Sequence, residues 1–306
     1  MRLTIRSLLR RARRVKNPFL VPFTQYLWSS TPPKHVKIDD EEQQFGDSPY
    51  SMPFSPSVTT ARILRMFLLS LFFLVALILF LAYTIYKPPS PVIRFLQWKY
   101  PDVLFHAPLL GTQRVVALTL DDAPSDETAK ILDILKTYEA KATFFVIGKQ
   151  VSSHPHLLQR MHDEGHELGN HAWADEPSIK LPLSELERQV KEVEALLPPN
   201  AHGAKYFRPG SGFFNKKLVD RVRSLGYRVV LGSIYPHDPQ IPNPRVNARH
   251  VLRMVKPGGI IIMHDRRSYS AEQLELVLKG LAAKSWKVES IGGLLRIADS
   301  RGKKGG

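Results

Sequence analysis

The chain has 306 residues, no cysteine and a formal net charge of +15. Its length allows one large domain or two small ones, and the lack of cysteine excludes disulfides, thiolate metal sites and cysteine nucleophiles. The net charge is +7 over residues 1–90 and +8 over residues 91–306, so the excess is dense only in the first segment. This uneven distribution does not indicate nucleic-acid binding, and no nucleic-acid partner is expected.

The first 65 residues have the composition of a basic, disordered tail. Six arginines and Lys16 lie in the first 16 residues, before any acidic residue, and prolines and small polar residues follow them. Such a segment cannot bury enough apolar surface to offset the entropy of ordering. A short membrane-surface helix or a transit peptide at the amino terminus is the alternative.

A transmembrane anchor is predicted over residues 66–86. Met66–Ile85 is a run of 20 residues without a charge, and a helix of that length spans about 30 Å, the thickness of a hydrocarbon core. Tyr83 and Tyr86 stand near its end, as interfacial aromatic residues do. A buried core helix is disfavoured because the run is apolar on every side.

The distribution of lysine and arginine predicts the orientation of this anchor. Basic residues are dense before the span and sparse after it, which places the amino terminus in the cytoplasm and the carboxyl-terminal domain in the lumen or outside the cell. Residues 87–113 are expected to form a stem. No Asn-x-Ser/Thr acceptor occurs in the sequence, so glycosylation gives no support for a lumenal location.

Residues 114–298 alternate between strand-like and helix-like segments, and residues 299–306 read as a flexible tail. Continuous apolar strands between amphipathic helices predict a parallel sheet covered by helices. The six or seven units are too few for an eightfold barrel, so the predicted fold class is α/β, a distorted or incomplete (β/α) barrel. The expected strands are Arg114–Leu120, Lys141–Ile147, His166–Asn170, Tyr227–Leu231, Gly259–Met263 and Lys287–Ile291. The expected helices are Ser125–Ala140, Gln150–Glu164, one opened by a Ser184–Glu187 capping box, Val246–Val255 and Ala271–Lys284.

Polar clusters follow five of these segments. In β/α barrels the loops after the strands form the active-site face, so these clusters are expected to converge on one mouth. They are TLDDAP at 119–124, NHAWAD at 170–175, FRPGSG at 207–212, YPHD at 235–238 and MHD at 263–265.

Carboxylates and imidazoles in these clusters indicate a metal-dependent hydrolase. Asp122, His171 and Asp175 offer three ligands for a divalent metal and leave positions for water and substrate. Zn²⁺ is the first choice, with Co²⁺, Ni²⁺ or Mn²⁺ as alternatives. Asp175 followed by Glu176 and Pro177 is also compatible with a simple turn.

The other polar residues suit proton transfer. Asp121 is a candidate base for water, and His264 is a candidate acid for a leaving amine. Arg208 is expected to hold Asp121 ionised and oriented. Arg266 and Arg267 follow His264 and are expected at the rim, as solvated charges or as attractors of an anionic substrate.

These motifs resemble those of the NodB-homology polysaccharide deacetylases, carbohydrate esterase family 4. TLDDAP is similar to the family's T-F-D-D-G-P, which implies Asp121 as the base and Asp122 as a metal ligand. HAWAD resembles H-x-x-x-H and implies His171 as a ligand. FRPGSG and MHD imply Arg208 as the partner of the base and His264 as the general acid.

The resemblance further implies a distorted barrel and hydrolysis of N-acetyl groups on chitin or related amino-sugar polymers. Asp175 stands where the family usually has a second metal histidine. The 232–239 segment departs from the usual tryptophan-bearing motif, although Asp238 remains able to orient His264. Pro209, Gly210 and Trp173 are expected on the substrate-binding side, with Trp173 packing under the site.

Two alternatives stay open beside a membrane-anchored deacetylase. One is a related hydrolase of small amides or cyclic imides, because the fold hosts such reactions. The other is a non-catalytic carbohydrate-binding barrel, which the replacement at Asp175 motivates. An N-acetylated carbohydrate and the membrane are the expected partners.

Overall fold

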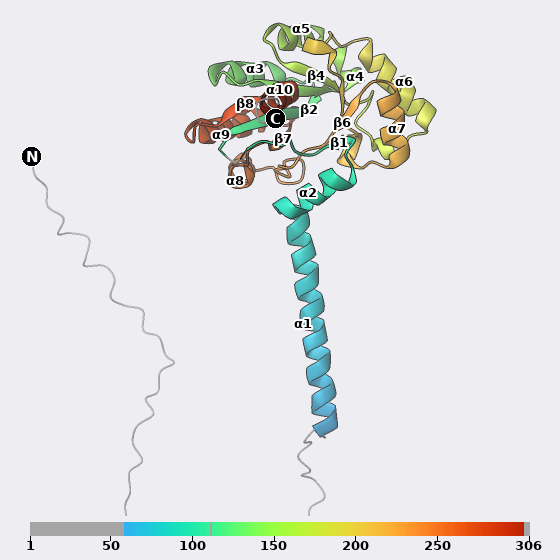
Figure 1. The fold of residues 1–306 in the computed structure, drawn as a ribbon, viewed down its shortest axis with the longest axis vertical. Helices are drawn as coiled ribbons and strands as arrows, with labels where there is room; N and C mark the ends of the chain where they lie inside the picture. Colours follow the sequence, from blue (N-terminus) through green and yellow to red (C-terminus); the bar gives the residue numbers. More distant parts are fainter. Residues whose placement is uncertain (1–57, 111, 303–306) are drawn as a thin grey trace, which may run out of the picture. The chain divides into compact units, whose positions relative to one another are not determined.

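The computed structural model describes residues 58–110 and 112–302. The predicted basic tail up to residue 57, and the last four residues of the predicted flexible tail, lie outside the described residues. The described part contains one long amino-terminal helix, a short connecting helix and a domain of parallel strands and helices (Figure 1).

Helix α1 runs from Val58 to Tyr86 and contains the apolar run that the sequence singled out. None of its residues is buried against the protein, and its mean hydropathy over an 18-residue window is 2.8. An exposed helix that is apolar on every side is unfavourable in water. By length and composition, α1 is therefore able to cross a membrane.

The core is an eight-stranded sheet in which every paired strand is parallel. The strand order is β1-β6-β5-β4-β3-β2-β7, and β8 pairs with β2. This curved, incompletely closed sheet confirms the predicted distorted (β/α) barrel. The strands are β1 Val103–Leu104, β2 Val115–Ala123, β3 Ala142–Val146, β4 Glu167–Asn170, β5 Tyr206–Phe207, β6 Arg228–Val230, β7 Ile260–His264 and β8 Lys287–Glu289.

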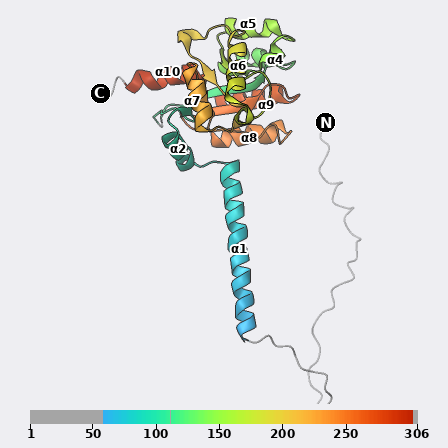
Figure 2. The same cartoon turned by 90° about the vertical axis from the view of Figure 1, so that its right-hand side faces the viewer.

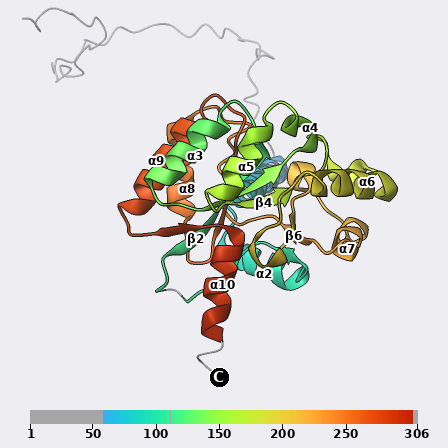
Figure 3. The same cartoon turned by 90° about the horizontal axis from the view of Figure 1, so that it is seen from above.

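Helices surround the sheet, as Figure 3 shows for α3, α5, α6, α7, α8 and α9. Helices α8 and α9 lie side by side (Figure 2). All nine residues of β2 are buried, which explains why its sequence is a continuous apolar run before its two aspartates. The helices of the domain are α3 Thr128–Thr137, α4 Gly148–Val151, α5 Pro155–Asp163, α6 Leu183–Glu194, α7 Lys216–Ser224, α8 Pro244–Met254, α9 Ser270–Ala282 and α10 Ile291–Gly302.

The segment expected as a stem contributes directly to the domain. Helix α2, Ser90–Lys99, buries Ile93 in the core cluster beneath β6. The Gln97 side chain accepts a hydrogen bond from the backbone N–H of Phe105 at 2.9 Å, and β1 pairs with β6. Residues before 114 therefore belong to the sheet and to its core.

Two local expectations differ from the structure. The expected helix Gln150–Glu164 is divided into α4 and α5, because Pro155 at the first position of α5 cannot donate the backbone hydrogen bond that a continuous helix needs. The prediction of a Ser184–Glu187 capping box is also wrong, since α6 begins at Leu183 after Pro182 and has no side-chain cap.

Candidate active site

Polar side chains gather at the carboxyl ends of the parallel strands. Asp121 and Asp122 belong to the end of β2, and His264 ends β7. Asp121 and His264 are register partners on these neighbouring strands, while His171 and Arg208 directly follow β4 and β5. The predicted convergence of these strand ends is therefore present in the fold.

Arg208 holds Asp121 in place from beneath. One guanidinium nitrogen, Nη1, donates to Asp121 Oδ1 at 2.5 Å and to Thr119 Oγ1 at 2.7 Å. The remaining groups, Nε and Nη2, donate to the carbonyl oxygens of Val230 and Leu231. Burial lowers the pKa of Arg208, and the carboxylate of Asp121 opposes that shift. Because its donors are all directed inward, Arg208 fixes the orientation of Asp121.

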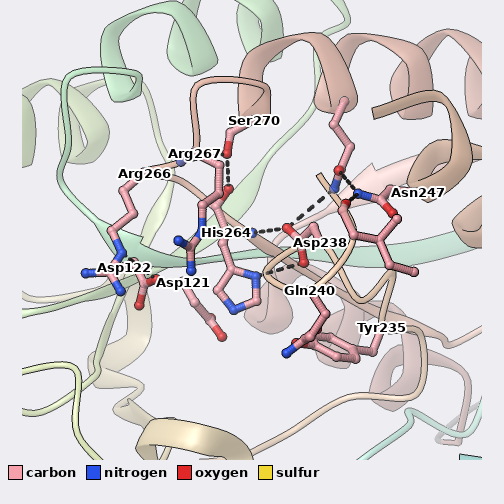
Figure 4. A network of polar contacts seen from close by, with 12 residues as sticks. Asp121, Asp122, Tyr235, Asp238, Gln240, Asn247, His264, Arg266, Arg267 and Ser270 are labelled. Carbon is pink, nitrogen blue, oxygen red and sulfur yellow. Dashed lines mark hydrogen bonds and ion pairs between the residues drawn. The ribbon is translucent and has the colours of Figure 1, made fainter. Parts of the chain in front are cut away.

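His264 is held by Asp238 in a similar way (Figure 4). Asp238 Oδ1 lies 2.9 Å from His264 Nδ1, and its Oδ2 accepts the backbone N–H of His264 at 2.9 Å. Tyr269 and Gln273 donate to the main chain and the carboxylate of Asp238. Burial lowers the pKa of His264, but the hydrogen bond and charge of Asp238, with the charges of Asp121 and Asp122, outweigh it and raise the pKa overall.

Asp122 and His171 form a second buried pair. His171 Nδ1 lies 2.7 Å from the carbonyl oxygen of Arg208, an acceptor that requires the proton to be on Nδ1. Its Nε2 then faces Asp122 Oδ1 at 3.7 Å. Burial raises the pKa of Asp122, while the charges of His171 and His264 oppose the rise.

Asp175 is connected to Asp122 through the side chain of Arg266. Arg266 Nε lies 3.1 Å from Asp122 Oδ2, and Arg266 Nη2 donates to Asp175 Oδ2. The guanidinium therefore bridges the two carboxylates that the sequence offered as metal ligands. Arg266 is exposed, as expected for a rim residue, but nothing in the MHDRR string shows that its side chain turns toward Asp122.

The donors match a divalent metal in part. His171 presents a free nitrogen beside a carboxylate and anchors its other nitrogen on a carbonyl, which is the usual support of a metal-binding histidine. Asp175, however, is directed to Arg266. Among the residues that the structure describes, no three histidine, aspartate or glutamate side chains are clustered closely enough to hold a metal ion. Asp122 and His171 thus fit the metal, and Asp175 does not in this arrangement.

The residues predicted on the substrate-binding side lie in the loops after β4 and β5. Gly210 follows Pro209 and donates its N–H to Ser178 Oγ at 2.8 Å. A Cβ at Gly210 would lie 2.1 Å from the carbonyl oxygen of Glu176, so only glycine permits this approach of the two loops. The Trp173 ring packs against Gly148, where an added Cβ would lie 2.4 Å from a ring carbon.

A further buried carboxylate, Asp265, supports the site without having been predicted to do so. Its two oxygens accept from Ser125 Oγ at 2.9 Å and Thr128 Oγ1 at 2.5 Å. Burial raises the pKa of Asp265 to about 7, against the lowering effect of those two hydrogen bonds. Its backbone N–H also donates to the carbonyl of Asp121, so it joins the ends of β2 and β7.

Comparisons with known proteins agree with this arrangement. A family model described as polysaccharide deacetylase matches residues 111–230, a range that includes Asp121, Asp122, His171 and Arg208. The peptidoglycan-N-acetylglucosamine deacetylase of Bacillus cereus is 28% identical over 208 residues, which are 66% of this chain and 93% of that protein. The chitooligosaccharide deacetylase of Rhizobium leguminosarum is 34% identical over 154 residues, which are 50% of this chain and 72% of that protein.

Other relatives differ in length or in activity. The chain spans only 40% of the peptidoglycan-N-acetylglucosamine deacetylase PgdA of Listeria monocytogenes, to which it is 31% identical. Among solved structures, a CE4 family pseudoenzyme from Bacillus anthracis superposes with a TM-score of 0.57 and 26% identity, covering 63% of this chain and 68% of that one. The same fold is thus present in proteins described as enzymes and in one described as a pseudoenzyme.

Proposed function

Because the chain belongs to the polysaccharide deacetylase family, carbohydrate esterase family 4, we propose that it hydrolyses the N-acetyl amide of amino-sugar units in a polymer such as peptidoglycan. The observation that carries this proposal is the pairing of two oriented proton-transfer groups, Asp121 with Arg208 and His264 with Asp238, on adjacent strands. Chitin is the first polymer that the sequence motifs imply. The Bacillus cereus relative favours peptidoglycan, and both substrates carry the same N-acetyl group.

Asp121 is the base in this proposal. The Arg208 guanidinium binds one oxygen of the Asp121 carboxylate and so keeps this carboxylate fixed while water approaches. Water loses a proton to Asp121 as its oxygen adds to the acetyl carbon. Asp121 therefore removes the proton without having to reorient.

His264 is the acid. Asp238 holds the proton on Nδ1 and so directs Nε2 toward the substrate, and the raised pKa keeps the imidazole protonated at a higher pH. The carbon–nitrogen bond breaks as Nε2 gives its proton to the sugar nitrogen. The products are acetate and a free amine.

We assign Asp122 and His171 as the residues that would hold a divalent cation, with Zn²⁺ as the first choice. Such a cation supplies Lewis-acid polarisation of the acetyl carbonyl. Without it, Asp122 would still be a buried carboxylate that needs a positive partner. Arg266 meets that need in the present arrangement.

Acetate release from peptidoglycan fragments and from N-acetylglucosamine oligomers tests the function. The full chain in detergent should release acetate in the presence of an added divalent metal, and the variant Asp121→Asn should not, although it should still bind metal. Asp220→Asn, an exposed carboxylate on α7, is the matched control and should retain activity. Equal acetate release by the wild type and Asp121→Asn would rule out this base. Small amides in the same assay test the hydrolase alternative.

A non-catalytic carbohydrate-binding barrel is the second candidate. The bridge from Arg266 to Asp122 favours it, because a guanidinium stands at the proposed metal ligand. The structural similarity to a pseudoenzyme also supports it. This candidate predicts binding of the glycan without acetate release at any metal concentration, and the same glycan affinity in the wild type and Asp121→Asn.

We also propose that α1 anchors the protein with its amino terminus in the cytoplasm and the domain of residues 114–298 outside it. The denser basic charge before α1 supports this orientation. Because the chain has no cysteine, single introduced cysteines report the side directly. A membrane-impermeant maleimide should label Leu110→Cys in intact cells, and should label Thr31→Cys only after lysis. The reverse pattern would overturn the orientation.

A further inference from the structure

Arg266 occupies an unusual position for a residue at the rim of an active site. It lies two residues beyond His264, and its partly exposed side chain turns toward Asp122 at the end of β2 (Figure 4). Two of its nitrogens contact two different carboxylates, Asp122 and Asp175. A planar guanidinium is suited to joining two carboxylates in this way.

The burial of Asp122 explains why such a partner is needed. Asp122 is 3% exposed, and a buried carboxylate without a positive partner is strongly unfavourable. The other arginine nearby, Arg208, already donates to Asp121, Thr119 and two carbonyls. Arg266 is therefore the arginine that pairs with Asp122, beside the imidazole of His171.

Asp175 keeps the guanidinium in this position. It stands where the resembled family usually has a second metal histidine, and its Oδ2 accepts a hydrogen bond from Arg266 Nη2. A neutral histidine at this position would offer a metal a ligand but would not attract a guanidinium by charge. The aspartate and the arginine thus form a matched pair, and each explains the presence of the other.

We propose that Arg266, held by Asp175, is a built-in cation that competes with a divalent metal for Asp122. While its guanidinium bridges the two carboxylates, a metal finds only His171 and one oxygen of Asp122 available. When the guanidinium withdraws, both oxygens of Asp122 become available beside His171. The proposal rests on the proposed function for the presence of a metal, and it concerns how tightly this chain holds that metal.

The structure provides a place for the displaced side chain. A hollow of about 440 Å³ adjoins Arg266, and its lining includes Asp126, Glu127 and Lys149. Asp126 lies 3.6 Å from His154, and Glu127 pairs with Lys130. Both carboxylates can attract a guanidinium that leaves Asp122, in competition with these basic neighbours and Lys149. Arg266 therefore has two electrostatically reasonable positions.

Zinc binding to the full chain in detergent, measured by competition with a chromophoric chelator, tests the proposal. Arg266→Gln should bind Zn²⁺ at least about tenfold more tightly than the wild type, because the competing positive charge is lost. Arg249→Gln, an exposed arginine of α8, is the matched control and should bind as the wild type does. Equal or weaker binding by Arg266→Gln overturns the proposal.

Thermal unfolding supplies a second measurement that does not depend on activity. In a chelator, Arg266→Gln should unfold at a lower temperature than the wild type, since Asp122 loses its partner, and Zn²⁺ should restore it. The wild type should respond little to either addition. If Arg266→Gln does not fold, Arg266→Lys replaces it, because a lysine cannot bridge both carboxylates and should bind Zn²⁺ more tightly than the wild type. A variant insensitive to Zn²⁺ overturns the proposal.

These readouts separate the proposal from the deacetylase function. Tighter zinc binding by Arg266→Gln without acetate release from any variant supports the competition and contradicts the catalytic function. Acetate release by a wild type that already binds Zn²⁺ as tightly as Arg266→Gln supports the function and overturns the competition.

Discussion

The carboxylate of Asp238 binds His264 twice, through the ring Nδ1 and through the backbone N–H, each at 2.9 Å. One side chain thereby sets both the position of the main chain at the end of β7 and the tautomer of the imidazole. Tyr269 donates to the carbonyl oxygen of Asp238 at 2.6 Å and fixes the loop that carries it. The candidate acid is thus positioned by a residue from a loop that the sequence motif left uncertain.

Asp238→Asn should lower the pKa of His264. Asp238 raises that pKa through its hydrogen bond and its charge, against burial, and the amide keeps the shape but not the charge. Since the acid must be protonated, activity is present below its pKa and is lost as the pH rises through it. The alkaline limb of the kcat/KM profile should therefore move to lower pH, with a decrease of roughly 10- to 100-fold at neutral pH. An unchanged alkaline limb would show that His264 is not the acid.

Gly210→Ala should destabilise the domain more than Gly212→Ala does. A Cβ at Gly210 meets the carbonyl oxygen of Glu176 at 2.1 Å, whereas nothing lies within 4 Å of a Cβ at Gly212. Gly212 has φ +72°, so alanine there costs about 1–2 kcal/mol of backbone energy. Overpacking at Gly210 should cost about 3 kcal/mol and displace the Arg208 loop. Urea unfolding of both variants checks the order, and the reverse order would contradict the close approach.

Much of this arrangement follows from the sequence, and the exceptions have physical reasons. Continuous apolar runs predicted the buried parallel strands, and the polar residues after them predicted which side chains meet. The two-residue strand β1 gave no detectable period, so its place in the sheet could not be predicted. The position of Arg266 depends on the direction of one long side chain and on a charge partner, Asp175, that is distant in sequence. Neither the side-chain direction nor the distant charge partner can be predicted from hydrophobic periodicity.

His166 should make stability depend on pH. Its side chain is 1% exposed, and Nδ1 accepts the backbone N–H of Ala142 at 3.2 Å. Burial has the largest effect on the pKa of His166, and together with the positive charges of Lys141 and Arg160 it lowers this pKa from 6.5 to about 4. Between pH 6.5 and pH 4 the unfolded chain binds a proton at His166 more readily than the folded chain does. The stability that neutral His166 contributes above pH 6.5 is therefore lost as the pH falls toward 4.

Protonation of His166 should lower the free energy of unfolding by about 2 kcal/mol between pH 7 and pH 5. Chemical unfolding of the wild type and His166→Gln at both values measures it. The difference in free energy of unfolding between the two proteins should shrink at pH 5, because glutamine does not titrate. A difference that is the same at both values would exclude a depressed pKa at His166.

Tyr86→Ala should reduce activity although Tyr86 is the last residue of α1, the helix proposed to span the membrane. The Tyr86 ring stacks on His237 with centroids 5.0 Å apart, and His237 Nε2 lies 3.0 Å from the carbonyl oxygen of Tyr86. His237 has φ +61°, which is unfavourable for a residue with a side chain, so its conformation depends on such contacts. The next residue is Asp238, which orients His264.

Loss of the Tyr86 ring should therefore loosen the loop that carries Asp238. The value of kcat should fall several-fold because His264 is misplaced, and KM should change less because the substrate contacts remain. Tyr86→Phe retains the stacked ring and is the matched control, expected to keep wild-type kcat. The full chain should accordingly be more active than a shortened chain that begins at Lys87. Equal kcat for Tyr86→Ala and Tyr86→Phe would show that the anchor does not support the catalytic loop.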